Sequence, residues 1–346
     1  MSLFRRLFPR EAASAPRDDA PVIAFWDWWH EGAQERITAS VTGGMDAALL
    51  DEMHARVDAI HPGLRWETAK GQTAAHALIV SAGGAPELRR IAERWRHASP
   101  PDDALWQFHT ARQRDESLSS TILTFRLLEV DMSAFVAVPT ENEPRQRVDL
   151  TLHHPVFGRL SPDERAQLGF LYLDALLGED DVERWIGQVD FVVRPIEGGV
   201  SGDTIIAAVD SLAQRPDDGM LRIGRGETSS GIAVVVSVRS RLHWLDRPTL
   251  DLHTELRLPF VGDENGLPTP GELQRLYALE DELSDAVGAR GEYYAQETTA
   301  GTRTLHWYTD SLDQNGRDSL DRFAKVHKLK VSHVADPGWQ AMQRFG

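Results

Sequence analysis

The feature that most constrains the fold is an order of elements that occurs at both ends of the 346-residue chain. Near the N-terminus, hydrophobic periodicity predicts strand, helix, strand, strand, helix and strand. The four strands are expected at residues 37–41, 64–68, 75–81 and 105–111. The same order returns between a strand at 249–258 and a strand at 330–334. Such an order is typical of a split βαβ unit, in which two helices cover one face of an antiparallel sheet.

We therefore expect an α+β protein with a ferredoxin-like (split βαβ) unit at the N- and C-terminal ends and a mixed β/α middle region. The expected parts are a disordered tail over residues 1–20, an N-terminal ferredoxin-like domain over 21–115, a middle β-meander and helical region over 116–215, and a C-terminal ferredoxin-like domain over 216–346. Capping-box patterns at 161–164 and 269–272 predict where two of the helices begin.

Composition excludes several functional classes. The chain has no Cys, so it forms no disulfide, Cys-ligated zinc site or thiol nucleophile. Its formal net charge of −16 argues against duplex nucleic acid as a direct partner, because such binding needs a basic face. We find no signal peptide and no apolar run of about 18 residues that could span a membrane. We therefore expect a cytoplasmic bacterial protein.

The sequence contains no recognisable catalytic motif. Gly226 and Gly231 have the spacing of a phosphate-binding loop, but Ile232 and Ala233 stand where Lys and Ser or Thr are required. A G-x-S-x-G nucleophile elbow is absent as well. We predict no catalytic residues and no cofactor, and the sequence favours a non-enzymatic role while leaving the question open.

Asp251, His253 and Glu255 are the candidate metal ligands. Alternation along a strand places the three side chains on one face, within reach of one ion. A second interpretation pairs this strand with the preceding one, 232–244, whose basic side chains would then form a ladder of opposite charges with the acidic ones. The sequence favours the charge ladder, and the metal site remains the alternative.

Two further groups are candidates for an interaction surface. The first is a cluster of three tryptophans within four positions, Trp26, Trp28 and Trp29. These side chains could form a partner-binding surface, or they could anchor a helix in the core. The large size of Trp favours the buried anchor. A second candidate, the acidic run 280–282, lies in the middle of a predicted helix.

Glu280, Asp281 and Glu282 belong to the most acidic part of the chain, residues 245–300, which hold 12 acidic and 4 basic side chains. We expect these three carboxylates to form a solvated helix face that meets a basic protein partner.

The C-terminal third, from about residue 217, resembles a bacterial family known as domain of unknown function 695. The residues that carry this resemblance are Gly266-Leu267-Pro268, Leu279-Glu280-Asp281-Glu282-Leu283, Thr298-Thr299-Ala300-Gly301-Thr302-Arg303 and His306-Trp307-Tyr308. The tail from Leu312 to Trp339 is similar to the regulator of ribonuclease E activity B, a ferredoxin-like protein, although Pro337 departs from that family's Asp-Gly-Trp pattern. These resemblances imply a ferredoxin-like fold and inhibition of a ribonuclease, and bring no catalytic residues.

The sequence thus favours an acidic protein-interaction or regulatory, inhibitor-like module whose partner is a basic enzyme such as a nuclease. The alternative is a metal- or small-molecule-binding protein, or an enzyme, with a pocket between domains. Its expected polar lining is Asp251, His253, Glu255 and His306.

Overall fold

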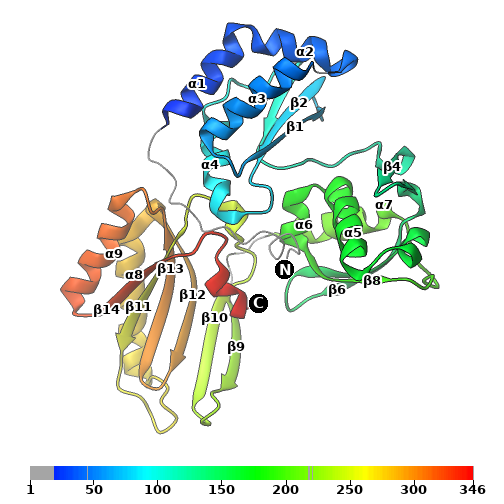
Figure 1. The fold of residues 1–346 in the computed structure, drawn as a ribbon. Coiled ribbons are helices and arrows are strands. Elements are labelled where there is room, and N and C mark those ends of the chain that lie inside the picture. Colours follow the sequence, from blue (N-terminus) through cyan, green and yellow to red (C-terminus); the bar gives the residue numbers. More distant parts are fainter. Residues whose placement is uncertain (1–18, 45, 217–218, 220, 346) are drawn as a thin grey trace. The chain divides into compact units, whose positions relative to one another are not determined.

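The computed structural model describes residues 19–44, 46–216, 219 and 221–345, and shows an α+β protein, as predicted. Its contacts divide the chain into two compact units, unit 1 up to Arg215 and unit 2 from Pro216 (Figure 1). The tail predicted for residues 1–20 lies outside the described residues except for its last two, of which Ala20 begins a helix. Within the described ranges, no helix has the length and apolar character needed to cross a bilayer.

Unit 1 begins with a helical segment interrupted by a π turn. Its parts are α1 (Ala20–Trp28), the π-helical turn η2 (Trp29–Ala33) and α2 (Gln34–Gly43). The strand predicted at 37–41 is wrong, because these residues lie in α2. Trp29, Ala33 and Ile37 are all buried and recur every four residues, so they continue one helical face into the core. Burial of this face outweighs the strand preference of the β-branched residues near Ile37.

Helix α3 and a small mixed sheet complete the N-terminal part. The elements are α3 (Ala47–Ile60), β1 (Arg65–Lys70), β2 (His76–Ser81), α4 (Pro86–His97) and β3 (Trp106–His109). The sheet has the order β1-β2-β3, with β2 antiparallel to β1 and parallel to β3. The described residues of this part therefore form three strands, and the four-stranded ferredoxin-like unit predicted for 21–115 lacks its first strand.

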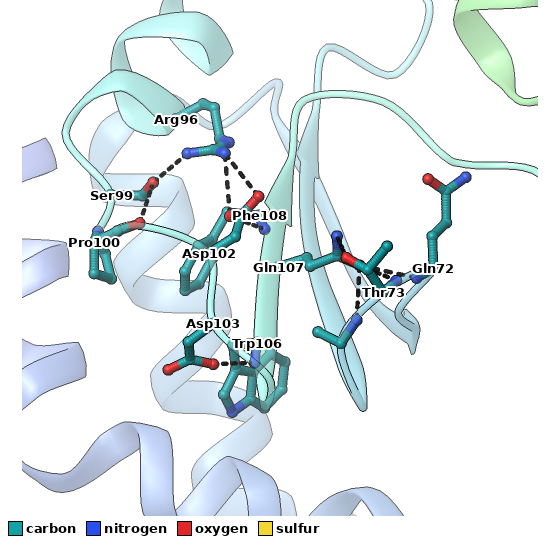
Figure 2. Close-up of polar contacts among 11 residues, drawn as sticks. Gln72, Thr73, Arg96, Ser99, Pro100, Asp102, Asp103, Trp106, Gln107 and Phe108 are labelled. Atoms are coloured by element: carbon teal, nitrogen blue, oxygen red, sulfur yellow. Dashed lines mark hydrogen bonds and ion pairs between the residues drawn. The ribbon is translucent and has the colours of Figure 1, made fainter.

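Polar side chains hold β3 in place (Figure 2). Gln107 Oε1 accepts hydrogen bonds from the backbone N–H groups of Gln72, Thr73 and Ala74 at 2.9, 3.1 and 3.3 Å. Arg96 pairs with Asp102 in the loop before β3. The Gln107 amide thus fixes the β1–β2 turn against the parallel strand and satisfies three backbone donors at once.

The middle part of unit 1 forms two further sheets with three helices. Its elements are β4 (Ile122–Phe125), β5 (Leu128–Asp131), β6 (Val136–Asn142), β7 (Arg147–His153), α5 (Pro162–Leu177), α6 (Glu179–Trp185), β8 (Ile186–Val192) and α7 (Gly202–Ala213). β4 and β5 pair as a hairpin, and β6-β7-β8 form a sheet whose last pair is parallel. Ser161 and Glu164 form the predicted capping box of α5. Helix α7 was not predicted.

Unit 2 is built on one antiparallel sheet. Its elements are β9 (Leu221–Glu227), β10 (Ala233–Arg239), β11 (Leu252–Pro259), α8 (Pro270–Val287), β12 (Gly291–Thr299), β13 (Thr302–Thr309), α9 (Gln314–His327) and β14 (Lys330–Ala335). The strand order is β14-β11-β13-β12-β10-β9. The predicted order of elements from 249 to 334 is confirmed, including the helix start at Thr269, whose hydroxyl accepts from Glu272 N.

Short 3₁₀ turns connect these elements. They are η3 (Leu118–Ser120), η4 (Met132–Ala134), η5 (Pro155–Arg159), η6 (Trp244–Asp246), η7 (Gly288–Arg290) and η8 (Gln340–Phe345).

The two faces of the unit 2 sheet have different coverings. Leu256 and Leu305 pack with Leu276 of α8 and with Leu320 and Phe323 of α9. The opposite face carries Ala295 and Tyr308, which pack with Trp339 and Met342 of the C-terminal segment. This segment, residues 336–345, therefore lies over the sheet face that the helices leave free.

Candidate metal centre

Strands β11 and β13 bring three metal-ligating side chains together on the sheet face away from α8 and α9. His253 and Glu255 are two residues apart on β11 and therefore point to the same side. His306 of β13 stands directly opposite Glu255 in the register, while His253 stands opposite Tyr308. The alternating neighbours Leu256 and Leu305 point to the helical side. The cluster thus follows from alternation and register.

The donor atoms of His253, Glu255 and His306 lie close enough to share one ion. One donor atom from each residue lies within 4.8 Å of the other two. His253 Nε2 is 3.0 Å from His306 Nδ1, and the two rings are nearly parallel, with centroids 5.2 Å apart. His306 is 0% exposed and His253 is 5% exposed, and Glu255 is half-buried. The arrangement is a buried two-histidine, one-carboxylate set.

One nitrogen of this cluster has no hydrogen-bond partner among the described residues. It is the buried Nε2 of His306. The Nε2 of His253 and the Nδ1 of His306 share one hydrogen bond, so one ring donates and the other accepts. An unpaired buried polar atom costs about 1–3 kcal/mol. The hydrogen bonds of the described residues therefore do not account for burying the His306 imidazole.

The local electrostatics keep both imidazoles neutral. Burial, followed by repulsion from a protonated His253, from Arg344 and from Arg257, lowers the pKa of His306 to about 3, so the two imidazoles disfavour each other's protonation. Burial is also the main reason why the pKa of His253 is lowered. Neutral imidazole is the form that binds metal ions. The Glu255 carboxylate is held by Arg257, whose guanidinium lies 3.2 Å from its Oε2.

A pocket of about 410 Å³ adjoins the cluster. Besides His253 and Glu255, it is lined by Val334, Ala335, Asp336, Ala341 and Arg344. The pocket therefore lies within unit 2, between the end of β14 and the C-terminal segment.

Asp336 and Trp339 fix the C-terminal segment beside this pocket. Tyr308 donates its hydroxyl proton to Asp336 Oδ2 at 2.6 Å, and the N–H groups of Gln340 and Ala341 donate to the same carboxylate. Trp339 stacks on Tyr308 with centroids 4.3 Å apart and donates its indole N–H to Leu250 O. The Asp336 carboxylate and the Trp339 indole thus hold the C-terminal segment, which forms one wall of the pocket, against the sheet.

The predicted charge ladder is wrong. Strand β10 pairs with β12 and β9, whereas β11 pairs with β13 and β14. Arg239 accordingly forms its ion pair with Glu292 of β12, at 2.9 Å. The strands are consecutive in the sequence but not neighbours in the sheet, because β12 and β13 lie between them.

Asp251 does not join the cluster. It precedes β11, and its carboxylate accepts hydrogen bonds from the backbone N–H and the hydroxyl of Ser311. The structure brings His306 to His253 and Glu255 instead. His306 was expected to line a pocket but was not predicted as a ligand, because the β11–β13 register that places it opposite Glu255 cannot be read from either strand alone.

The predicted tryptophan cluster is buried in the core of unit 1. The exposed fractions are 5% for Trp26, 6% for Trp28 and 0% for Trp29. Trp26 Nε1 donates to Trp95 O, and the Trp26 and Trp95 rings stack. Their candidacy as an interaction surface therefore does not fit the structure, which shows them as buried anchors of the α1–η2 segment.

Glu280, Asp281 and Glu282 do not form one acidic surface. Glu280 pairs with Arg303 at 2.6 Å, where the Arg303 side chain is 5% exposed. Glu282 bonds to His327 of α9, and Asp281 is exposed. Two of the three predicted surface carboxylates therefore have partners within the unit.

A second group of titratable side chains lies in unit 1 around Asp174. Burial, together with the nearby Glu179, raises the pKa of Asp174 to about 7, while Arg112 opposes the shift. Arg112 in turn pairs with Glu67. The backbone N–H of Arg112 also donates to Glu179 of α6 at 3.4 Å, so these contacts join α6 to β1 and we assign the group a structural role.

Comparison with known proteins found no match to any family model, to any curated protein or to any solved structure. The family resemblances predicted from the sequence have no support from these comparisons.

Proposed function

We propose that the protein binds a divalent transition-metal ion in unit 2 through His253, Glu255 and His306. The observation that carries this proposal is the convergence of three donor atoms within 4.8 Å on a buried sheet face. The short distance of 3.0 Å between His253 Nε2 and His306 Nδ1 supports it, because two imidazole nitrogens this close can bind the same ion.

The donor types favour zinc and similar ions over calcium or magnesium. Two imidazole nitrogens and one carboxylate suit Zn²⁺, Co²⁺ or Fe²⁺, whereas Ca²⁺ and Mg²⁺ prefer oxygen ligands. In a tetrahedral site with Zn–N bonds of about 2.0–2.1 Å, the two nitrogens stand about 3.3 Å apart. His253 Nε2 and His306 Nδ1 are 3.0 Å apart, so small ring rotations open the site.

The acidic-interaction hypothesis stays a prediction. Its carboxylates at 280–282 point to different partners, and no described contact favours a nuclease or another basic protein. We also propose that strands β11 to β14 and helices α8 and α9 form a ferredoxin-like unit. The order of these four strands in the sheet, β14-β11-β13-β12, supports this proposal. A cytoplasmic location is proposed from the sequence alone.

Equilibrium dialysis of the full chain against Zn²⁺ tests the metal site. We expect one ion per chain in the wild type. Glu255→Gln should weaken binding by more than the roughly 10- to 100-fold that loss of an outer hydrogen-bond partner costs, because it removes a direct ligand.

His333→Gln is the matched control. His333 lies on the neighbouring strand β14 but points to the helical side, where it bonds to Thr254 and Asp321. Its loss should leave zinc affinity unchanged. If the wild type takes up no zinc, or if both variants lose it equally, the assignment of the site is wrong.

A further inference from the structure

Arg344 is the cationic side chain of the pocket. It is exposed at the end of η8, and among the described residues no carboxylate pairs with it. Its guanidinium lies 4.5 Å from the centre of the Phe345 ring. The nearby Asp336 carboxylate is already occupied by the Tyr308 hydroxyl and two backbone N–H groups. Arg344 therefore remains able to bind an anion in the pocket.

Three protein ligands leave a metal ion incompletely coordinated. Sites with two histidines and one carboxylate keep at least one position for water or an external ligand. His253, Glu255 and Arg344 line the same pocket, so an external ligand of an ion held by the two side chains would bind from this pocket.

The remaining walls are apolar. Val334, Ala335 and Ala341 contribute them, and the volume of about 410 Å³ lies within the usual range of small-molecule sites. The pocket thus combines the two candidate metal ligands His253 and Glu255 and the cationic Arg344 with a short apolar wall.

We propose that this pocket binds a small organic carboxylate, one oxygen of which coordinates the metal ion while the other pairs with Arg344. This inference rests on the proposed metal site. The planar guanidinium matches the two oxygens of a carboxylate. Phosphate fits less well, because it carries about −1.5 to −2 charges in a pocket that already contains Glu255 and Asp336.

The test uses the full chain loaded with Co²⁺, whose visible absorption reports its ligands. Sodium butyrate, sodium acetate and inorganic phosphate are titrated separately. Butyrate should change the spectrum and bind about 15-fold more tightly than acetate, because it has two more methylenes and each one buried on the apolar wall contributes about a factor of four. Phosphate should bind more weakly than butyrate.

Arg344→Gln should weaken butyrate binding by at least about tenfold, since it removes a charge-assisted hydrogen bond, without weakening Co²⁺ binding. Arg322→Gln is the matched control. It removes the same charge from an exposed position on α9, which packs on the other sheet face, and should leave both affinities unchanged.

The outcomes separate the two proposals. If Co²⁺ does not bind, the metal site is wrong and this inference falls with it. If Co²⁺ binds but butyrate leaves the spectrum unchanged, only the inference is overturned. Equal butyrate binding by metal-free protein, or tighter binding of phosphate than of butyrate, would also overturn it.

Discussion

Glu280 shows that the charge of a residue does not reveal what its side chain contacts. It precedes the exposed residues Asp281 and Glu282 on α8, yet its carboxylate reaches Arg303 on β13. Arg303 also donates to Thr298 Oγ1, and its guanidinium lies 5.5 Å from the centre of the Tyr277 ring. Burial raises the pKa of Glu280, although the Arg303 hydrogen bond opposes the shift. The pair is therefore an internal contact between α8 and the sheet.

Glu280→Gln should lower the free energy of unfolding of unit 2 by about 2 kcal/mol, because it leaves the buried Arg303 charge without its counter-charge. Asp281→Asn, next to it but exposed, should change the free energy by no more than about 0.5 kcal/mol. Urea denaturation of the two variants measures the difference. If the two variants were equally stable, the Glu280 carboxylate would be solvated, as the sequence predicted for residues 280–282, and would not be an internal contact.

The candidate site could be predicted only in part. Alternation on one strand correctly brought His253 and Glu255 together, because that pattern is local. Asp251 was included for the same reason, but the strand begins one residue later and its carboxylate turns to Ser311. The contribution of His306 depends on a pairing between residues about 50 positions apart, which no local pattern determines.

At the scale of elements, the helical segment from Ala20 to Gly43 is shaped by one glycine. Gly32 has φ +117° and ψ 0° inside the π turn η2, so the chain changes its helical register between Trp29 and Ala33. Trp29 and Ile37, on either side of this glycine, are both fully buried. Gly is the residue that adopts such a backbone conformation at little cost.

Gly32→Ala should therefore destabilise unit 1 by about 1–2 kcal/mol, although a Cβ there would meet no atom within 4 Å. Gly271→Ala is the matched control, since it lies in the first turn of α8 with equally open space and no positive φ. It should stabilise the protein by about 0.5–1 kcal/mol. Thermal unfolding followed by circular dichroism measures both, and a stabilising effect at Gly32 would show that η2 is an ordinary helix.

Elements with strong local signals were predicted well. Thr269 with Pro270, and Ser161 with Glu164, mark helix starts that the structure reproduces. The turn at Ala300 and Gly301 joins β12 to β13, and both residues have positive φ. The predicted strand in α2 failed because its β-branched residues suit a strand locally, whereas burial of a helical face settles the structure.

At the scale of the whole molecule, the metal donors all come from one of the two compact units. His253, Glu255 and His306 lie on strands of the same sheet, and the C-terminal segment that completes the pocket belongs to the same unit. Strand order was the least predictable feature of this unit, because β10 is followed in the sequence by β11 but pairs with β12. The site is thus assembled by non-local pairing within one unit.

Zinc binding should accordingly stabilise unit 2 without stabilising unit 1. At a free zinc concentration of about 100 times Kd, the expected stabilisation is about 2.7 kcal/mol. Bound zinc opposes only those local or global unfolding events that disrupt its binding site. Hydrogen–deuterium exchange should therefore slow in β11, β13 and η8 and stay unchanged in β6 to β8 and α4. In Glu255→Gln at the same zinc concentration, the slowing should disappear. Equal slowing in both units, or slowing that survives in this variant, would show that zinc acts elsewhere on the chain.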